Sequence, residues 1–538
     1  MPSSFARFIP AALFCAAILP IATARGQWTD NPSVNTPVCT AAGDQVQPKI
    51  RNAAGGASYV SWFDNRTGGY DVYLQRLDAA GVPQWTANGI EIADRSVSST
   101  EDYGLAVDAS DNAVLVYGLV NFDALAVQKV DPAGNKLWGP GGVVFNPPDQ
   151  HSPRVAITSD DYTIIGWSQN GGIVLHKLDA TGALQWGPGG VSITEASRTL
   201  LLADLQPGDN GSVIALWVRC GGTNCILSNK HLYAQKYDAA GTPLWNGGSP
   251  RIIFDGTSLQ NATFPPFLPD GAGGAIFGWY ENGGSRNAYV QHVDAAGNEL
   301  FPHNGVASTG VTAGRIRISA SVAYDAAANE IYLSSVESSS PTQNMWGVRA
   351  QRYSAIGARQ WTDDGAVVSA MDASQEGFDR TVAFGGGCIT HWFEDTGGGT
   401  AVVKSARLDA SGAQAWSGSP VLASTRPTGK SRLDVARDDC GMSKLVWSDG
   451  ASGGGQDVLV QNVRSNGTLG PAVPTPPGDM NCDGSVTLGD VDAFVDALLD
   501  PIGYAAANIC CPISNGDMNS DTFIDGLDAA GFVDALVP

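Results

Sequence analysis

The sequence predicts a mainly β fold: a β-propeller of eight four-stranded blades, followed by a small α-helical domain. Three observations favour this. A short phrase recurs roughly every 50 residues between residues 27 and 470, a period typical of propeller blades. The chain has 66 Gly and 14 Trp but only 16% charged residues, as expected for many short strands joined by turns. Residues 478–538 differ sharply from this pattern and carry two copies of an acidic loop.

The recurring phrase is an alternating strand, then Asp-x-x-Gly, then a Trp. Its first copy ends in Asp78, Gly81 and Trp85. In such a turn the Asp side chain caps the backbone and Gly takes a positive φ. An eighth copy, residues 464–467, lacks its Trp. The copies between them are Asp131–Gly134 with Trp138, Asp179–Gly182 with Trp186, Asp238–Gly241 with Trp245, Asp294–Gly297 with Phe301, Ser354–Gly357 with Trp361 and Asp409–Gly412 with Trp416.

A second Trp lies upstream of the turn in most units, within an apolar alternating segment. With Trp28, which begins a further copy of the strand after the turn, the two positions account for 13 of the 14 Trp, so the Trp content is architectural. Each unit reads as four short strands separated by Gly and Asp turns, which is the pattern of a propeller blade. The upstream residues are Trp62, Trp167, Trp217, Trp279, Trp392 and Trp447.

The segment that the eighth unit lacks is found at the other end of the chain. Gln27-Trp28-Thr29-Asp30 resembles Gln84-Trp85-Thr86-Ala87, where the last strand of a unit begins. An N-terminal strand that completes the last blade would close the ring and remove an open sheet edge. We therefore expect eight blades. A seven-bladed ring or an open array is the alternative, because the second unit, with Tyr117 in place of Trp, and the sixth unit are degenerate.

Residues 1–26 have the features of a secretory signal peptide: Arg7, an apolar run from Phe8 to Ile21, and the small residues Ala22-Thr23-Ala24. We expect a secreted protein, extracellular or at the cell surface, with no membrane insertion after cleavage. The net charge of −22 argues against nucleic acid or an anionic membrane as partner.

Eight cysteines remain after signal cleavage, an even number that suggests disulfides in an oxidising compartment. We expect Cys220 to pair with Cys225, and Cys482 with Cys510 or Cys511. A further plausible pair is Cys388 with Cys440, which leaves Cys39 and one of the two adjacent cysteines unassigned.

The two acidic loops, residues 479–490 and 517–528, predict a pair of calcium sites. Each has oxygen-bearing side chains at positions 1, 3, 5 and 12, the spacing with which a short loop surrounds Ca²⁺, and a backbone carbonyl at position 7. Each leads into an amphipathic helical stripe. Residues 478–538 hold eleven Asp but no Lys, Arg or Glu, so we expect this domain to fold on Ca²⁺. The predicted ligands are Asp479, Asn481, Asp483, Ser485 (backbone) and Asp490 in the first loop, and Asp517, Asn519, Asp521, Phe523 (backbone), Asp525 and Asp528 in the second.

Residues 478–484 and their second copy resemble the duplicated EF-hand-type loop and helix of type I dockerin domains. That resemblance implies docking to a cohesin-type partner, and in this family the modules often belong to polysaccharide-degrading proteins. The second loop has Thr522 where the sharp-turn Gly is expected. The repeat phrase resembles that of uncharacterised bacterial secreted repeat proteins, which implies a propeller-like fold and no activity. Residues 471–477, rich in Pro, form a stiff linker between the two domains.

Candidate chemistry in the propeller lies two residues after the upstream Trp, where four units carry an acid. In a closed ring these acids, with Arg66 nearby, would lie at one rim. They could bind a cation or sugar hydroxyls, or hold an acid/base pair for glycoside cleavage; the alternative is that each starts a turn. A Gln three residues before the turn Asp, as in Gln75, is expected to hydrogen-bond between blades. The acids are Asp64, Glu281, Glu394 and Asp449.

No nucleophile elbow, phosphate loop or zinc-protease motif occurs in the sequence. The leading hypothesis is therefore a secreted, calcium-binding, non-enzymatic protein whose propeller binds a ligand such as a polysaccharide or acts as a scaffold. Its dockerin-like module would anchor it to a cohesin-type or cell-surface partner. The alternative is an extracellular polysaccharide-degrading enzyme, a glycoside hydrolase or lyase, that carries a dockerin.

Overall fold

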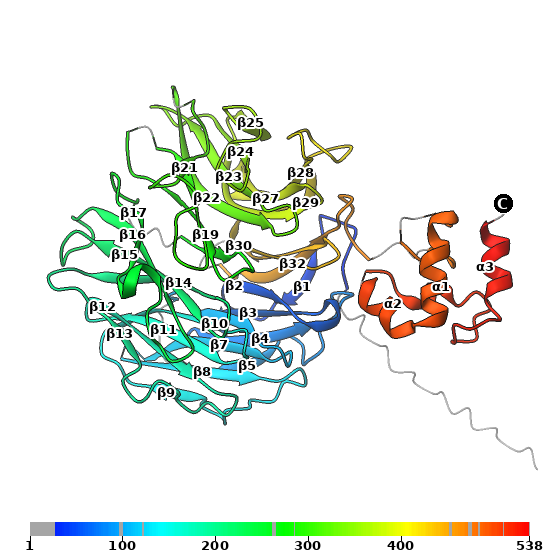
Figure 1. Cartoon of the computed structure of the whole chain (residues 1–538), viewed down its shortest axis with the longest axis horizontal. Coiled ribbons are helices and arrows are strands. Elements are labelled where there is room, and N and C mark those ends of the chain that lie inside the picture. The colour runs from blue at the N-terminus through cyan, green and yellow to red at the C-terminus, as the bar shows by residue number, and fades with distance from the viewer. Residues whose placement is uncertain are drawn as a thin grey trace, which may run out of the picture.

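The computed structural model describes residues 27–95, 100–120, 123–260, 265–284, 286–311, 313–450, 454–471, 476–482, 485–508 and 510–536. Eight four-stranded antiparallel sheets form the propeller, and the first strand of each blade contacts the first strands of its neighbours around a closed circle (Figure 1). The predicted signal peptide, most of the linker and Asp483 lie outside the described residues.

The first four blades contain sixteen strands in chain order. Blade 1 is β2 (Gln45–Asn52), β3 (Ser58–Asp64), β4 (Asp71–Leu77) and β5 (Ile90–Ala93). Blade 2 is β6 (Gly104–Val107), β7 (Ala113–Val120), β8 (Ala124–Val130) and β9 (Val143–Phe145). Blade 3 is β10 (Gln150–Ile157), β11 (Thr163–Gln169), β12 (Gly172–Leu178) and β13 (Val191–Ile193). Blade 4 is β14 (Leu200–Pro207), β15 (Val213–Cys220), β16 (Lys230–Tyr237) and β17 (Arg251–Phe254).

The remaining blades follow the same order, except that the last takes one strand from the N-terminus. Blade 5 is β18 (Phe267–Pro269), β19 (Ala275–Tyr280), β20 (Ala288–Val293) and β21 (Val306–Ala307). Blade 6 is β22 (Arg315–Asp325), β23 (Glu330–Ser339), β24 (Trp346–Tyr353) and β25 (Ala366–Asp372). Blade 7 is β26 (Gln375–Phe384), β27 (Gly387–Gly397), β28 (Thr400–Leu408) and β29 (Val421–Thr428). Blade 8 is β30 (Lys430–Arg437), β31 (Ser443–Asp449), β32 (Asp457–Val463) and β1 (Thr36–Cys39).

The predicted closure of the ring by the N-terminal strand is confirmed. Strand β1 pairs antiparallel with β32, with Thr36 opposite Val460, so the sheet of blade 8 joins both ends of the repeat array. The prediction of eight blades is therefore confirmed over the seven-bladed and open alternatives, and the degenerate second and sixth units form complete blades. In blade 2, Tyr117 is buried where most other blades have the upstream Trp.

The Trp after each turn joins its blade to the next. Trp85 of blade 1 donates its indole N–H to the carbonyl of Pro132, inside the Asp-x-x-Gly turn of blade 2, at 3.1 Å. Trp28 does the same for blade 8, donating to Ala79 in the turn of blade 1 at 2.8 Å. We call this the inter-blade Trp contact. Its other donors and acceptors are Trp138 with Ala180, Trp186 with Ala239, Trp245 with Ala295, Trp361 with Ala410 and Trp416 with Ser465.

The turn Gly is required by the same contact. Gly81 has φ +79°, and a Cβ on it would come within 2.6 Å of the Trp28 ring. Any other residue would therefore meet both backbone strain and a clash with the aromatic ring of the preceding blade. The predicted blade-to-blade role of the repeated Gln is wrong: Gln75 accepts from the backbone N–H of Trp85 at 3.1 Å and so positions the Trp of its own blade.

Three disulfides are present. Cys220–Cys225 and Cys482–Cys511 are among the predicted pairs, but Cys440 pairs with Cys510 rather than with Cys388. Cys388 is fully buried between blades 6 and 7, whereas Cys440 is exposed in the turn between β30 and β31, so the two cannot meet. Cys39 and Cys388 are buried free thiols.

The C-terminal module, residues 476–536 as described, is helical. It contains the 3-10 turn η3 (Leu488–Asp490), helices α1 (Val491–Leu499) and α2 (Pro501–Ala507), the 3-10 turn η4 (Ile513–Gly516) and α3 (Ala529–Leu536). The rings of Phe494 and Phe532 stack at 4.0 Å between centroids, so the two predicted stripes pack on each other. Helix α2 was not predicted. None of the described helices is long and apolar enough to cross a bilayer.

The ring closure predicts a large loss of stability on removal of one side chain. Trp28 is 2% exposed and packs between blades 8 and 1, so Trp28→Ala should cost about 3–5 kcal/mol of unfolding free energy. Chemical denaturation measures this. Trp346, which lies outside both repeat positions and is only partly buried, is the control, and Trp346→Ala should cost clearly less. Equal losses in the two variants would contradict a special role for Trp28.

A second prediction concerns the attachment of the module. The Cys440–Cys510 disulfide is a covalent link from the propeller to the module in addition to the linker. The double variant Cys440→Ser and Cys510→Ser should leave the propeller's unfolding midpoint unchanged, increase the radius of gyration measured by X-ray scattering, and speed proteolysis of residues 471–477 severalfold. The control pair, Cys220→Ser and Cys225→Ser, should change neither. An unchanged radius of gyration in the first variant would show that other contacts hold the module.

Candidate functional site

The first strands of several blades bulge at corresponding points along the central channel. The strand pairing shifts between Val46 and Lys49 in blade 1 and between Gly377 and Arg380 in blade 7. Within each of these bulges one non-glycine residue has positive φ, a conformation that costs about 1 kcal/mol or more and is concentrated at functional sites. The residues are Gln47, Ser152, Ser319, Phe378 and Arg432.

Four of these five residues line one cavity at the mouth of the channel. Its volume is about 640 Å³. We call it the mouth cavity. It lies toward the start of the first strands, where β10, β26 and β30 bulge. The lining residues are Gln47, Pro48, Lys49, Thr100, Glu101, Asp102, His151, Ser152, Ser168, Leu201, Phe378, Arg380, Arg432, Leu433 and Asp434.

Two arginines of the mouth cavity lack a carboxylate partner. Among the described residues, neither Arg380 nor Arg432 has a carboxylate oxygen within the 4.0 Å of an ion pair. Arg380 donates to the backbone carbonyl of Asp379 at 2.9 Å, and Arg432 is exposed. Unpaired guanidinium groups that face a cavity are suited to carboxylate or sulfate groups, which they bind in a bidentate manner.

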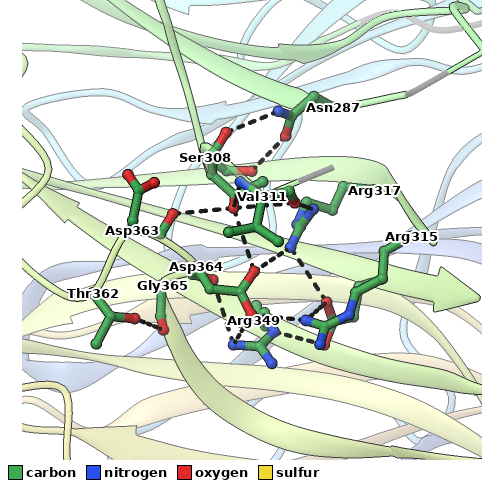
Figure 2. A network of polar contacts seen from close by, with 12 residues as sticks. Asn287, Ser308, Val311, Arg315, Arg317, Arg349, Thr362, Asp363, Asp364 and Gly365 are labelled. Atoms are coloured by element: carbon green, nitrogen blue, oxygen red, sulfur yellow. Dashed lines mark hydrogen bonds and ion pairs between the residues drawn. The ribbon is translucent and has the colours of Figure 1, made fainter. Parts of the chain in front are cut away.

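Many arginines elsewhere in the propeller are neutralised by acids. Figure 2 shows such a cluster, in which Arg315 and Arg317 contact the two oxygens of Asp364 at 2.7 and 2.8 Å. Arg349 donates its Nε to Glu337 at 2.7 Å. Arg407, Arg437 and Arg464 also lack an ion pair among the described residues, but none of them lines the mouth cavity. The binding role of Arg380 and Arg432 therefore rests on their position at the cavity.

His151 contributes to the same cavity. Its Nδ1 lies 3.0 Å from Glu101 and its Nε2 lies 3.1 Å from Asp149. Both contacts can be hydrogen bonds at once only if both ring nitrogens carry a proton. Both ring nitrogens of His151 are thus engaged by carboxylates, and a free basic nitrogen for catalysis would require one of these contacts to open.

Ion pairs link neighbouring blades at the mouth cavity, and three of their residues, Lys49, Asp102 and Asp434, line it. Asp102 contacts Lys49 at 2.8 Å and Arg154 at 2.9 Å, and Arg51 contacts Asp434 at 2.9 Å. Burial opposes ionisation of Asp102, but the two cations outweigh it and hold its pKa well below the usual range. A second cavity of about 540 Å³ adjoins the mouth cavity. The two share four lining residues: Lys49, Asp102, Arg380 and Asp434. Lys49, Arg51 and Arg154 are thus used in ion pairs, whereas Arg380 and Arg432 are not.

The predicted rim acids do not line the mouth cavity. Asp64 is buried in blade 1, where Trp62 Nε1 donates to it at 2.9 Å and Arg66 pairs with it. Burial opposes ionisation, but these hydrogen bonds lower the pKa of Asp64. The other three are engaged in the same way: Glu281 accepts from Thr257 and Tyr289, Glu394 pairs with Lys404, and Asp449 accepts from Trp447, Arg426 and Thr428.

The four acids lie in four different blades, and each is held by polar contacts within the propeller. Those of Asp449 come partly from Arg426 and Thr428 on β29 of the neighbouring blade 7. A ligand-binding role for them stays a prediction.

The structure reveals one buried acid that was not predicted. Glu376 lies directly opposite Glu394 in the β26–β27 pairing and is 2% exposed. Burial, with a smaller effect from Glu394, raises the pKa of Glu376 to about 7.

The two acidic loops fold as the repeat predicts, and each is closed by its last Asp. Asp490 accepts backbone N–H groups from Met480, Asn481 and Thr487 at 2.8 to 2.9 Å. Asp528 accepts the equivalent N–H groups of the second loop, from Met518, Asn519 and Asp525.

The oxygen-rich donor set of these loops fits Ca²⁺. Asp479, Asp490 and Asp528 are fully buried in a module whose sequence contains no Lys or Arg to offset them. Asp517 and Asp521 accept backbone N–H groups of their own loop. Within the described part of the chain, no three His, Cys, Asp or Glu side chains gather closely enough to hold a metal ion, and Asp483 is outside it. Calcium binding therefore stays a proposal.

The backbone positions predicted as ligands are accessible. Ser485 and Phe523 are exposed, as is Asp525, whose side chain accepts from the N–H of Leu527 at 2.7 Å. Thr522 adopts φ +75° at the turn where Gly is expected, a strained conformation for a β-branched residue. The strain is consistent with a weaker second loop.

Sequence reasoning missed the mouth cavity because its residues lie outside the repeat phrase. A signal was available. Lys49, Arg154 and Arg380 each lie two residues after a bulge residue of a first strand. An alignment of the first strands would have shown this recurring cation.

Comparisons with known proteins give no family. No family model matches the chain, and no curated protein matches it. Among solved structures, an ulvan lyase, a polysaccharide lyase bound to a –[GlcA(1-4)Rha3S]– chain, is 10% identical, with 83% of this chain and 97% of that chain covered and a TM-score of 0.45. The α-L-arabinofuranosidase of Fusarium graminearum with arabinobiose is 10% identical over 58% and 92%, with a TM-score of 0.33. TM-scores this low carry no argument about function.

The calcium loops can be tested directly. The double variant Asp479→Ala and Asp517→Ala removes the first ligand of each loop and should abolish the calcium-induced gain of helical circular dichroism that we expect for residues 478–538. Asp534→Ala, an acid on α3 outside both loops, is the matched control and should retain the gain. A calcium response in the double variant equal to that of the unmodified protein would contradict the assignment.

Proposed function

We propose that this is a secreted protein whose propeller binds an acidic polysaccharide at the mouth cavity, and whose C-terminal module holds two Ca²⁺ ions and anchors it to a cohesin-type or cell-surface partner. The observation that carries the proposal is the pair Arg380 and Arg432, which face a 640 Å³ cavity without a carboxylate partner in the described chain. The binding reading is preferred over catalysis because both nitrogens of His151 are engaged.

The surroundings of the two arginines suit a sugar. Phe378 is 41% exposed at the mouth, so its ring offers an apolar surface to the C–H groups of a pyranose. Gln47 and Ser152 add hydrogen-bonding side chains in the same cavity. The chain as a whole carries a net charge of −22, so a polyanion would be repelled over most of the surface and held where the cations are unpaired.

The anchoring role rests on the dockerin resemblance and on exposed apolar side chains. Leu488 is 81% exposed, Ile502 84% and Leu527 71%. Apolar exposure of this extent on a small module is typical of an interaction surface. The three disulfides are consistent with an oxidising, extracellular setting.

The second candidate is a polysaccharide-degrading enzyme, a lyase or a glycoside hydrolase. The observation that favours it is the pair His151 and Glu101 in the same cavity as the arginines. An imidazole beside cations could remove a proton next to a sugar carboxylate once a contact opens. Incubation of residues 27–538 with acidic polysaccharides, followed by assays for new reducing ends and for unsaturated products, separates the two candidates. Product formation that His151→Gln abolishes would establish the enzyme.

The binding proposal predicts the effect of removing each unpaired charge. Arg432→Gln and Arg380→Gln should each weaken binding of polygalacturonate about tenfold or more, because each removes a charge-assisted contact. Calorimetric titration at low and high salt measures this, and added salt should weaken binding by the unmodified protein. Lys136→Gln removes a cation from a turn outside the cavity and is the control. Unchanged affinity in both arginine variants would overturn the proposal.

A further inference from the structure

A second, smaller groove adjoins the mouth cavity between blades 7 and 8. Its volume is about 250 Å³, and Phe378 lines both it and the mouth cavity. Phe393 lies beside Phe378, with 5.7 Å between ring centroids. Phe393 is buried, so Phe378, which is 41% exposed, is the aromatic ring that a ligand in the groove can contact. Its remaining lining includes Ala401 and the backbone of several glycines. We call it the side groove.

The side groove offers no cation to an acidic ligand. Lys430 lines it, but its ammonium donates to the carbonyl of Arg426 at 3.0 Å and to Thr428 Oγ1 at 3.1 Å, and lies 3.3 Å from Asp449. An ammonium has three donors, so these contacts use them all. The exposed carboxylate of Asp395 would repel an anion.

The carboxyl group of Glu376 is likewise turned away. The Ser369 hydroxyl of blade 6 donates to the carboxyl group of Glu376 at 3.1 Å, so this group points toward blade 6. Phe393, on the neighbouring strand, packs in the core shared with blade 8. The occupant of the groove therefore meets the exposed ring of Phe378, the uncharged polar residues Gln375 and Thr400, several glycines and one solvated carboxylate.

We propose that the side groove is a subsite for an uncharged sugar, next to the acidic sugar held by Arg380 and Arg432. This rests on the proposed function of the mouth cavity and specifies its ligand. The ligand is a polysaccharide in which an acidic residue is followed by a neutral one. The polysaccharide passes over Phe378, which contacts both sugars. Arg380 and Arg432 bind the acidic sugar and thereby determine which sugar lies in the side groove.

Gly377 provides a way to close the side groove alone. It lies opposite Phe393 in the β26–β27 pairing, so a side chain there would project from the same sheet face as Phe393. A Cβ built on Gly377 meets no atom within 4 Å, and its φ is not in the left-handed region. Gly377→Trp therefore fills the groove without backbone strain. Gly189, which has equally open space on an exposed loop of blade 3, gives the matched control Gly189→Trp.

The test uses two probes of equal length. A hyaluronan hexasaccharide alternates uronic acid with an uncharged sugar, and a galacturonate hexasaccharide is acidic throughout. The unmodified protein and Gly189→Trp should bind the alternating probe about tenfold more tightly than the acidic one. Gly377→Trp should lose this preference and retain its affinity for the acidic probe, with an unchanged thermal unfolding midpoint as evidence of folding.

The outcomes separate the two proposals. Equal affinity of the unmodified protein for both probes, or a preference that survives in Gly377→Trp, would overturn the side-groove subsite and leave the mouth cavity as the binding site. Binding of neither probe, or binding that Arg432→Gln leaves intact, would overturn the proposed function and with it the subsite. Loss of the preference in Gly377→Trp but not in Gly189→Trp supports the subsite.

Discussion

The inter-blade Trp contact is the interaction on which the rest of the propeller depends. In each case an indole ring covers the Gly of the next turn and its N–H satisfies a carbonyl in that turn, so one side chain both packs against and hydrogen-bonds its neighbour. Because Trp28 makes this contact from the N-terminal segment to blade 1, the ring is closed by the same chemistry that joins its interior blades. At one of these positions Phe301 replaces the Trp. Its ring packs on Gly357 in the same way, but it has no N–H to donate.

The sequence predicted the features that repeat and missed those that do not. The Trp, the turn Gly and the N-terminal strand recur or match a repeat position, so the blades and their closure could be predicted. The mouth cavity depends on one or two side chains from each of several blades, and their convergence is set by ring geometry that no single repeat contains. Cys440 was assigned to the wrong partner for a similar reason: a turn of blade 8 and residue 510 are brought together only in the folded chain.

The division between repeating and non-repeating residues also separates stability from binding. The Trp and Gly of the contact lie toward the last strands of the blades, whereas Phe378, Arg380 and Arg432 lie in bulges of the first strands. A bulge changes the direction of a side chain without disturbing the remaining strand pairs. Substitutions at the mouth can therefore alter the ligand while the inter-blade contacts keep the ring intact, which explains how a regular fold carries an irregular site.

The position of the module is consistent with this arrangement. Strand β30 begins beside the mouth cavity, with Arg432 in its bulge, and ends at the turn that contains Cys440. At about 3.3 Å per residue, the extended strand from Arg432 to Arg437 and the turn beyond it carry the chain away from the mouth toward the opposite end of the blade. The disulfide to Cys510 therefore holds the module at the far end of blade 8. An anchored protein of this design leaves its mouth cavity and side groove open to a polysaccharide while the module contacts its partner.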